Sequence, residues 1–147
     1  MLRKSIAAAV GLTLALAPAS LAASPRKGAT YMGKTSQGET VAFDVSSNGK
    51  KVQNFETALT YRCSGEHDGQ SGSFVLEEMR VKGGEFTAKQ TLRGTSDESV
   101  VQDGTGKVHG TFKKKGRTAT GTLRSTLTLT GGETCDSGKV SFKLAIL

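Results

Sequence analysis

Apolar and polar residues alternate with a period of two through most of this chain. No segment after residue 23 shows a clear apolar period of 3.6 residues. Successive side chains of a strand point to opposite faces, whereas one apolar face of a helix repeats every three or four residues. The alternation therefore restricts the chain to β-structure. It is clearest over residues 40–45, 55–63, 86–92, 108–112, 119–129 and 140–146.

Threonine occupies the polar parity of the longest of these runs. Between residues 118 and 130 it alternates with Ala119, Leu123, Leu127 and Leu129. A β-branched polar residue suits the solvated side of a pleated sheet, so each sheet is expected to have one wet face. Val52 is out of phase with Phe55, which predicts a β-bulge near Gln53–Asn54.

Glycine-rich turn signals separate the runs. They lie at Asn48-Gly49, Gly83-Gly84, Gly104-Thr105-Gly106, Lys115-Gly116-Arg117 and Gly131-Gly132, and two longer polar segments span residues 64–72 and 94–107. Strands at such regular spacing indicate an all-β fold. We predict an antiparallel β-sandwich of about eight or nine strands, with a closed up-and-down β-barrel as the alternative.

The first 23 residues have the layout of a secretory signal peptide. Arg3 and Lys4 precede an uncharged stretch over residues 5–17, and Pro18 and small residues follow up to Ala23. The apolar stretch is shorter than the ~20 residues that span a bilayer as a helix. We therefore expect cleavage after Ala22 or Ala23 and no transmembrane segment afterwards.

After this cleavage, residues 24–28 are expected to be a flexible lead-in and residues 29–147 a single β-domain. The signal peptide predicts an exported protein, periplasmic or extracellular. Removing residues 1–23 also removes 16 of the 52 apolar residues and lowers the net charge from +7 to +5. The remaining domain is basic and has few residues with which to build a core.

Two cysteines, Cys63 and Cys135, lie in this domain, and an oxidising compartment favours a disulfide between them. They are 72 residues apart, and closing a loop of that length contributes roughly 4 kcal/mol in the loop-entropy model. The spacing offers neither a CxxC redox pair nor a metal-binding motif. We predict a structural disulfide.

Three segments carry a resemblance to known proteins. They are Gly110–Leu123 (GTFKKKGRTATGTL), Cys135–Phe142 (CDSGKVSF) and Tyr61–Cys63 (YRC). Together they resemble an uncharacterised family of small secreted bacterial β-rich proteins with one disulfide, over most of residues 30–146. The resemblance implies the β fold and supplies no functional residues.

Glu66, His67 and Asp68 are the candidate acid–base or ligand residues, because they are consecutive in the glycine-rich 64–72 loop. Consecutive loop residues seldom converge on one point without partners elsewhere, so a solvated loop is the preferred interpretation. His109 has the parity opposite to Val108 and Phe112, which predicts that it faces solvent. No metal or catalytic role is assigned to either histidine.

Asp97, Glu98 and Asp103 lie among glycines in the 94–107 segment and raise the question of calcium. The EF-hand spacing is absent, and acidic residues in a polar loop are usually only hydrated. Calcium binding there is left open.

Basic residues cluster at Lys113, Lys114, Lys115 and Arg117, around a predicted hairpin tip, and again at Lys50-Lys51. A positive finger of this kind suits an anionic polymer or surface. Lysines at hairpin tips also protect strands from aggregation, which is the preferred interpretation. Neither cluster contains the aromatic residues on which bases stack, so nucleic acid is not expected as a partner.

No catalytic motif is present. The chain lacks G-x-S-x-G, a P-loop and a G-x-G-x-x-G between strand and helix. Tryptophan is absent, five of the six phenylalanines have inward parity, and Tyr31 is the aromatic residue expected to be exposed. A platform for stacking sugars is therefore not predicted.

These observations favour a non-catalytic exported β-domain with a surface-binding or structural role and no cofactor. A carrier that holds a small ligand in a barrel interior is the alternative hypothesis. An enzyme that uses the 64–72 loop is the third.

Overall fold

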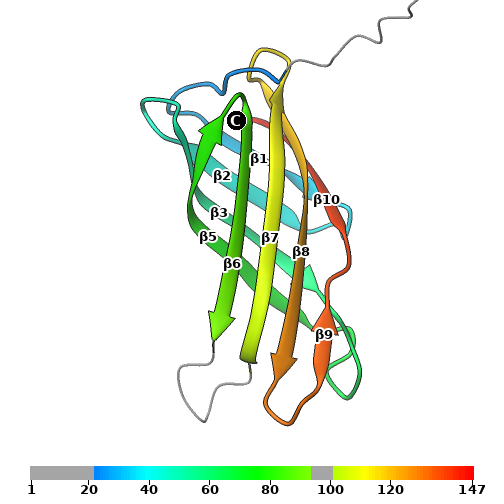
Figure 1. Ribbon diagram of the computed structural model, residues 1–147. Helices are drawn as coiled ribbons and strands as arrows, with labels where there is room; N and C mark the ends of the chain where they lie inside the picture. The colour runs from blue at the N-terminus through cyan, green and yellow to red at the C-terminus, as the bar shows by residue number, and fades with distance from the viewer. Residues whose placement is uncertain (1–21, 94–100) are drawn as a thin grey trace, which may run out of the picture.

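The computed structural model describes residues 22–93 and 101–147, and within them the chain forms strands and loops without a helix (Figure 1). This confirms the all-β prediction. The predicted signal peptide falls almost wholly outside the described residues. The described strands are β1 (Thr30–Thr35), β2 (Thr40–Val45), β3 (Lys51–Thr60), β4 (Arg62–Cys63), β5 (Ser71–Lys82), β6 (Glu85–Arg93), β7 (Val101–Lys113), β8 (Thr118–Leu129), β9 (Thr134–Asp136) and β10 (Val140–Ile146).

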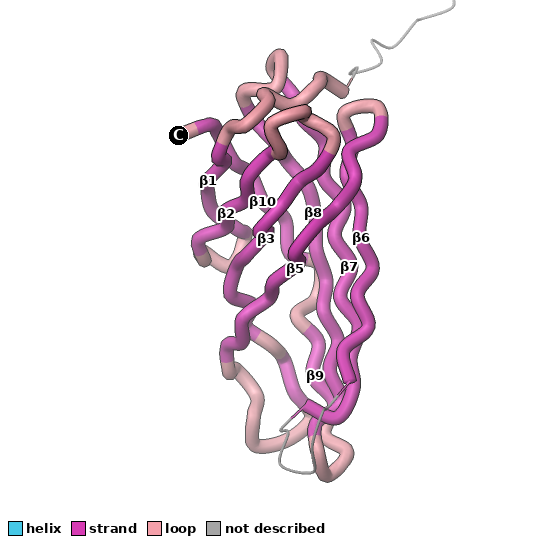
Figure 2. Tube along the Cα trace, turned by 90° about the vertical axis from the view of Figure 1, so that its left-hand side faces the viewer, coloured by secondary structure: helices cyan, strands magenta, loops and turns pink. Residues whose placement is uncertain are grey.

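Every pairing between these strands is antiparallel, and eight of the described strands form a closed ring. The ring runs β1-β2-β3-β5-β6-β7-β8-β10, and β10 pairs with both β8 and β1. β9 and the two-residue β4 extend the sheet from the end of β8. The upright strands β6, β7 and β8 cross in front of the oblique strands β1, β2, β3 and β5 (Figures 1 and 2).

Within the ring, β5 and β6 have the fewest paired residues. These strands pair only next to their hairpin, through Val81 with Phe86 and Lys82 with Glu85. Beyond that point no register pair joins the two strands, and they diverge (Figure 2). Both predicted architectures match one aspect of the structure. The strand pairings form a ring, as in a barrel, and the strands lie in two crossing layers, as in a sandwich (Figure 1).

All eight aromatic residues of the chain lie in the core. Phe43 is central, because its ring lies 5.0 Å from that of Tyr31, 5.4 Å from Phe86 and 6.0 Å from Phe112. Phe55 continues the cluster, 5.7 Å from Phe142. Such offset and edge-on ring pairs contribute about 0.5–1.5 kcal/mol each beyond the area that they bury. The inward parities predicted for the phenylalanines are confirmed.

The expectation that Tyr31 is exposed is wrong. Its side chain is fully buried, and its hydroxyl donates to the carbonyl oxygen of Gly116 and accepts from the backbone N–H of Arg26. Burial raises the pKa of the Tyr31 hydroxyl. A tyrosine is tolerated inside the sheet here because its polar tip reaches these backbone groups at the end of the barrel.

The turn predicted at Gly104-Thr105-Gly106 is also wrong, because these residues lie inside β7. Both glycines are buried and face inward, and a Cβ at Gly106 would lie 2.4 Å from Cε2 of Phe74. Here glycine provides space for an aromatic ring and does not reverse the chain. The 94–107 segment predicted as a loop is therefore strand from Val101 onward.

The bulge predicted near Gln53–Asn54 is confirmed. The register between β2 and β3 shifts between Ala42 and Asp44, and Asn54 adopts a left-handed conformation with φ 55°. The extra residue returns both Val52 and Phe55 to the buried face.

The two ends of the barrel are held by different contacts. At one end, residues of the expected 24–28 lead-in and those before it bond to the body, with Ala23 N–H donating to Phe112 and Gly28 N–H to Ser46. At the other end, Cys63 on β4 is disulfide-bonded to Cys135 on β9, which is its direct neighbour in the ladder. The predicted disulfide is confirmed.

We predict that Gly110→Ala destabilises the protein by about 1–3 kcal/mol, the usual cost of overpacking a core. A Cβ at Gly110 would lie 2.1 Å from Cζ of Phe86. Urea denaturation measures the change. Gly72→Ala is the matched control, since its Cβ would make an ordinary contact of 3.5 Å with Tyr61. Equal stability of the two variants would contradict the space-filling role of the rings.

We also predict that the double variant Cys63→Ser/Cys135→Ser loses up to about 4 kcal/mol of unfolding free energy, because a 72-residue closure is released in the unfolded chain. Thermal unfolding with and without excess dithiothreitol gives an independent measurement on the unmodified protein. An unchanged thermal midpoint in the reductant would show that the disulfide contributes little.

Candidate functional site

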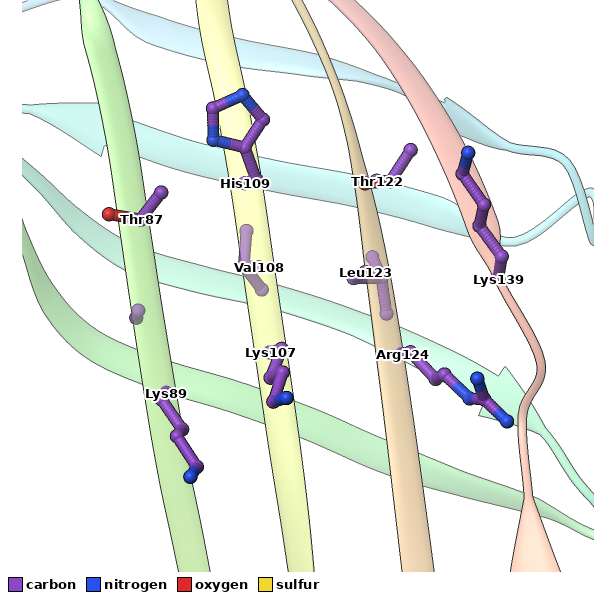
Figure 3. Close-up of a pocket in the computed structure, with 10 residues that line it drawn as sticks. Thr87, Lys89, Lys107, Val108, His109, Thr122, Leu123, Arg124 and Lys139 are labelled. Atoms are coloured by element: carbon purple, nitrogen blue, oxygen red, sulfur yellow. The ribbon is translucent and has the colours of Figure 1, made fainter.

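Three cations form a row across the outer face of β6, β7 and β8. Lys89 is the register partner of Lys107, and Lys107 is the partner of Arg124. All three side chains are exposed, and Figure 3 shows them side by side on the three strands. Lys139, just before β10, adds a fourth exposed cation at the end of this row. We call these four residues the cationic row.

The row works against stability. Cross-strand neighbours have Cβ atoms about 4.5–5.5 Å apart, and like charges placed directly opposite each other are destabilising. Edge protection does not explain it, because Lys107 lies on β7, which is paired on both sides. A costly arrangement at a central, exposed position suggests a function outside the fold.

Only one member of the row is neutralised by an acid among the described residues. Arg124 donates to Asp136 through Nε at 3.0 Å and through Nη2 at 2.5 Å. This pair lowers the pKa of the Asp136 carboxyl and raises that of Arg124. Lys89, Lys107 and Lys139 form no ion pair within the described part of the chain. Their charges are therefore available to an anion.

A row of polar side chains adjoins the cations. His109 on β7 lies between Thr87 on β6 and Thr122 on β8, and its side chain is exposed, as predicted. Together the two rows border a shallow depression of about 560 Å³ whose floor includes Val108 and Leu123 (Figure 3). Lysine ammonium, threonine hydroxyl and imidazole groups there can bind anionic and hydroxyl groups of a ligand.

The strands β6, β7 and β8 carry five bases and only two acids, Glu85 and Asp103, among the described residues. Asp44, Glu56, Glu77 and Glu78 belong to β2, β3 and β5, and Glu78 is paired with Lys51 at 2.7 Å. The net positive charge is thus concentrated on the β6–β8 side. Such asymmetry produces a positive potential over this side of the barrel.

The predicted basic cluster lies at the tip of the β7–β8 hairpin. Lys113 ends β7, Lys114 and Lys115 have φ 51° and 57°, and all three are exposed together with Arg117. The hairpin geometry agrees with the prediction, but the cationic row was not predicted. The row depends on the register of this hairpin, in which Lys113 is opposite Thr118. The turn predicted at residues 115–117 is one residue shorter and would have placed Lys107 opposite Ser125, so it did not reveal the row.

The 64–72 loop is tied to the β8–β9 turn by Glu133. Its Oε1 accepts from the backbone N–H groups of Gly65 and His67, at 2.9 and 3.0 Å, and its Oε2 lies 2.6 Å from Nδ1 of His67. The His67 hydrogen bond lowers the pKa of Glu133, and Glu133 raises that of His67. The side chains of His67 and Glu133 are 31% and 15% exposed, so the pair is partly shielded from water.

The three candidate loop residues lie in different environments. Glu66 and Asp68 are exposed, and Asp68 accepts from the backbone N–H of Cys63 at 2.9 Å. His67 has a partner that sequence reasoning missed, because Glu133 lies 66 residues further along the chain. The hydrogen bonds of Asp68 and Glu133 hold the loop in place.

Of the three acids considered for calcium, Asp97 and Glu98 lie outside the described residues. Asp103 lies in β7 opposite Arg93. Among the described residues, Cys63, Glu133 and Cys135 come together as a group of potential metal ligands. Both cysteines are in the disulfide, so they provide no thiolate.

Within the described ranges there is no helix that is long and apolar enough to cross a membrane. Comparisons with protein-family models, with curated proteins and with solved structures found no match to this chain.

We predict that Glu133→Gln lowers the thermal midpoint most between about pH 4.5 and 6.5. The raised pKa of His67 stabilises the fold fully below its ordinary value of 6.5, and this contribution is lost as the pH rises through the folded value. The lowered pKa of Glu133 stabilises the fold above its ordinary value of 4.5, and this contribution is lost as the pH falls through the folded value.

Thermal unfolding across this pH range measures the effect, and an NMR titration of His67 follows its pKa directly. His109→Gln is the matched control, since it removes a histidine from an exposed strand position. A difference between Glu133→Gln and the unmodified protein that does not vary with pH would contradict the role of the pair.

Proposed function

We propose that this protein is a non-catalytic binding domain that holds an anionic polymer on the outer face of β6, β7 and β8. The observation that carries the proposal is the cationic row, in which Lys89, Lys107 and Arg124 are directly opposite one another on paired strands. The mutual repulsion of these side chains decreases when anionic groups bind between them.

The geometry of the face suits an extended ligand. Neighbouring strands are about 4.8 Å apart, so the row covers about 10 Å from β6 to β8. Lys139 extends it toward β10. A polymer that repeats sulfate, phosphate or carboxylate groups can lie along this row. Thr87 and Thr122 can then donate hydrogen bonds to its hydroxyl or ether oxygens.

A polymer fits this face better than a lipid surface or a nucleic acid. All eight aromatic side chains are buried, so none is available to anchor in a membrane interface or to stack on bases. The same fact argues against sugar recognition by stacking. Recognition would depend on charge and hydrogen bonds.

We further propose that the protein is exported, to the periplasm or the medium. The disulfide between Cys63 and Cys135 supports this, because such bonds persist in oxidising compartments. The leader-like arrangement of residues 1–23 supports it as well. An anionic polysaccharide is a partner that an exported protein meets.

The triple variant Lys89→Gln/Lys107→Gln/Lys139→Gln is expected to bind heparin, a sulfated polysaccharide, about a hundredfold more weakly at low salt. Each lysine near an anionic surface contributes about 1 kcal/mol, or about fivefold in affinity. The variant should also be slightly more stable, because a repulsive row has been removed. Calorimetric titration and urea denaturation measure the two effects.

Lys113→Gln/Lys114→Gln/Lys115→Gln is the matched control, because it removes the same charge from the hairpin tip. It should lose much less affinity. Equal losses would show that only net charge matters, and a larger loss in the control would place the site at the tip. Stronger binding to anionic lipid vesicles than to heparin would overturn the choice of a polymer.

A further inference from the structure

A cleft opens where β5 and β6 diverge, on the side of the barrel next to the cationic face. It has a volume of about 370 Å³, within the range of sites that hold small molecules. Its lining comes from β5, β6, β7 and β8 and from Tyr61 and includes Phe74, Gln90, Leu92, Val101 and Leu127. We call this the β5–β6 cleft.

Apolar side chains in the cleft are incompletely covered. Leu92, Val101 and Leu127 are half-buried, and the last two pack against the core cluster. Phe86 and Leu123, further along β6 and β8, are fully buried. The aromatic cluster thus covers the middle of the barrel and leaves apolar surface accessible at this end. An apolar molecule that entered here would bury that surface.

The polar residues of the lining are Tyr61, Ser73, which is exposed, and Gln90. Gln90 has the inward parity of Phe86 and Leu92, is half-buried, and makes no side-chain hydrogen bond to the described residues. The hydroxyl of Tyr61, by contrast, is engaged with Ser125 at 3.1 Å. Gln90 can therefore both donate to and accept from a bound molecule.

The chemistry of the lining selects the class of ligand. None of the described residues that line the cleft is an acid or a base of the Asp, Glu, Lys, Arg or His type. A charged head would lose its hydration without gaining a counter-charge. A neutral head that both donates and accepts would instead pair with the Gln90 amide.

We propose that the β5–β6 cleft binds a small neutral amphipathic molecule. Its apolar body lies against Leu92, Val101 and Leu127, and its hydroxyl or amide head hydrogen-bonds to Gln90. This site is separate from the cationic row and does not depend on the proposed polymer binding. A small-ligand carrier is the alternative hypothesis drawn from the sequence. The proposed site is of that kind, but its ligand enters from the side of the barrel.

Addition of a peptide strand is the competing use of the divergent edges. Lys89 and Arg93 on β6 and Glu77 and Arg80 on β5 are exposed along these edges. Charged residues of this kind discourage strand pairing. The inward-facing apolar side chains favour a small molecule.

Fluorescence of N-phenyl-1-naphthylamine, a neutral apolar probe, tests the proposal with the full chain. We expect enhancement on binding, displacement by 1-dodecanol, and weak displacement by dodecanoate. Leu92→Trp should fill the cleft and weaken probe binding at least tenfold. Thr91→Trp adds the same ring at an exposed position one residue away and should leave binding within about twofold.

Circular dichroism and thermal unfolding establish that each variant folds. If Leu92→Trp does not fold, Gln90→Leu tests the head group. We expect it to weaken displacement by 1-dodecanol about fivefold, the value of one neutral hydrogen bond, and to leave displacement by naphthalene unchanged.

Three results would overturn the proposal. They are no fluorescence enhancement, equal probe binding by Leu92→Trp and Thr91→Trp, and displacement by an extended apolar peptide but not by 1-dodecanol. The last would assign the edges to strand addition. The triple lysine variant should bind the probe normally, so failure of this proposal and failure of polymer binding are distinguishable.

Discussion

Packing of aromatic rings against glycines of β7 and β8 is the contact on which the rest of this structure depends. The ring of Phe74 occupies the position of a missing Cβ at Gly106, that of Phe86 does so at Gly110, and that of Phe142 at Gly121. The two layers can therefore approach closely with few apolar residues. The same strand β7 directs Lys107 outward between its inward glycines Gly106 and Gly110, so it contributes both to the core and to the cationic row.

The core is uneven along the barrel, and this unevenness explains two other features. The aromatic cluster centred on Phe43 covers the middle and the end near Tyr31. Toward the other end, β5 and β6 diverge and apolar side chains remain accessible. There the disulfide and the Glu133 hydrogen bonds hold the chain where apolar packing is thin. The β5–β6 cleft lies where ring packing stops.

The two proposed sites differ in chemistry because they lie on opposite faces of the same strands. Residues of outward parity on β6, β7 and β8 provide the cationic row and its threonines, whereas inward residues Gln90, Leu92 and Leu127 line the cleft. Repulsion within the row lowers the stability of the fold. The apolar surface of the cleft remains in contact with water and therefore does not stabilise the fold.

The sequence by itself determined the β class, the inward side of most strands, the disulfide and the exposure of His109, because alternation and cysteine count are local properties. Tertiary structure decided what depends on register between distant strands. The row of Lys89, Lys107 and Arg124, the contact of His67 with Glu133 and the burial of Tyr31 exist only after the ring has closed. In the sequence, Gly104 and Gly106 look like a turn, because glycine is used both where the chain reverses and where a neighbouring side chain needs space. Only the structure shows that Leu127 lies against Gly104 and Phe74 against Gly106.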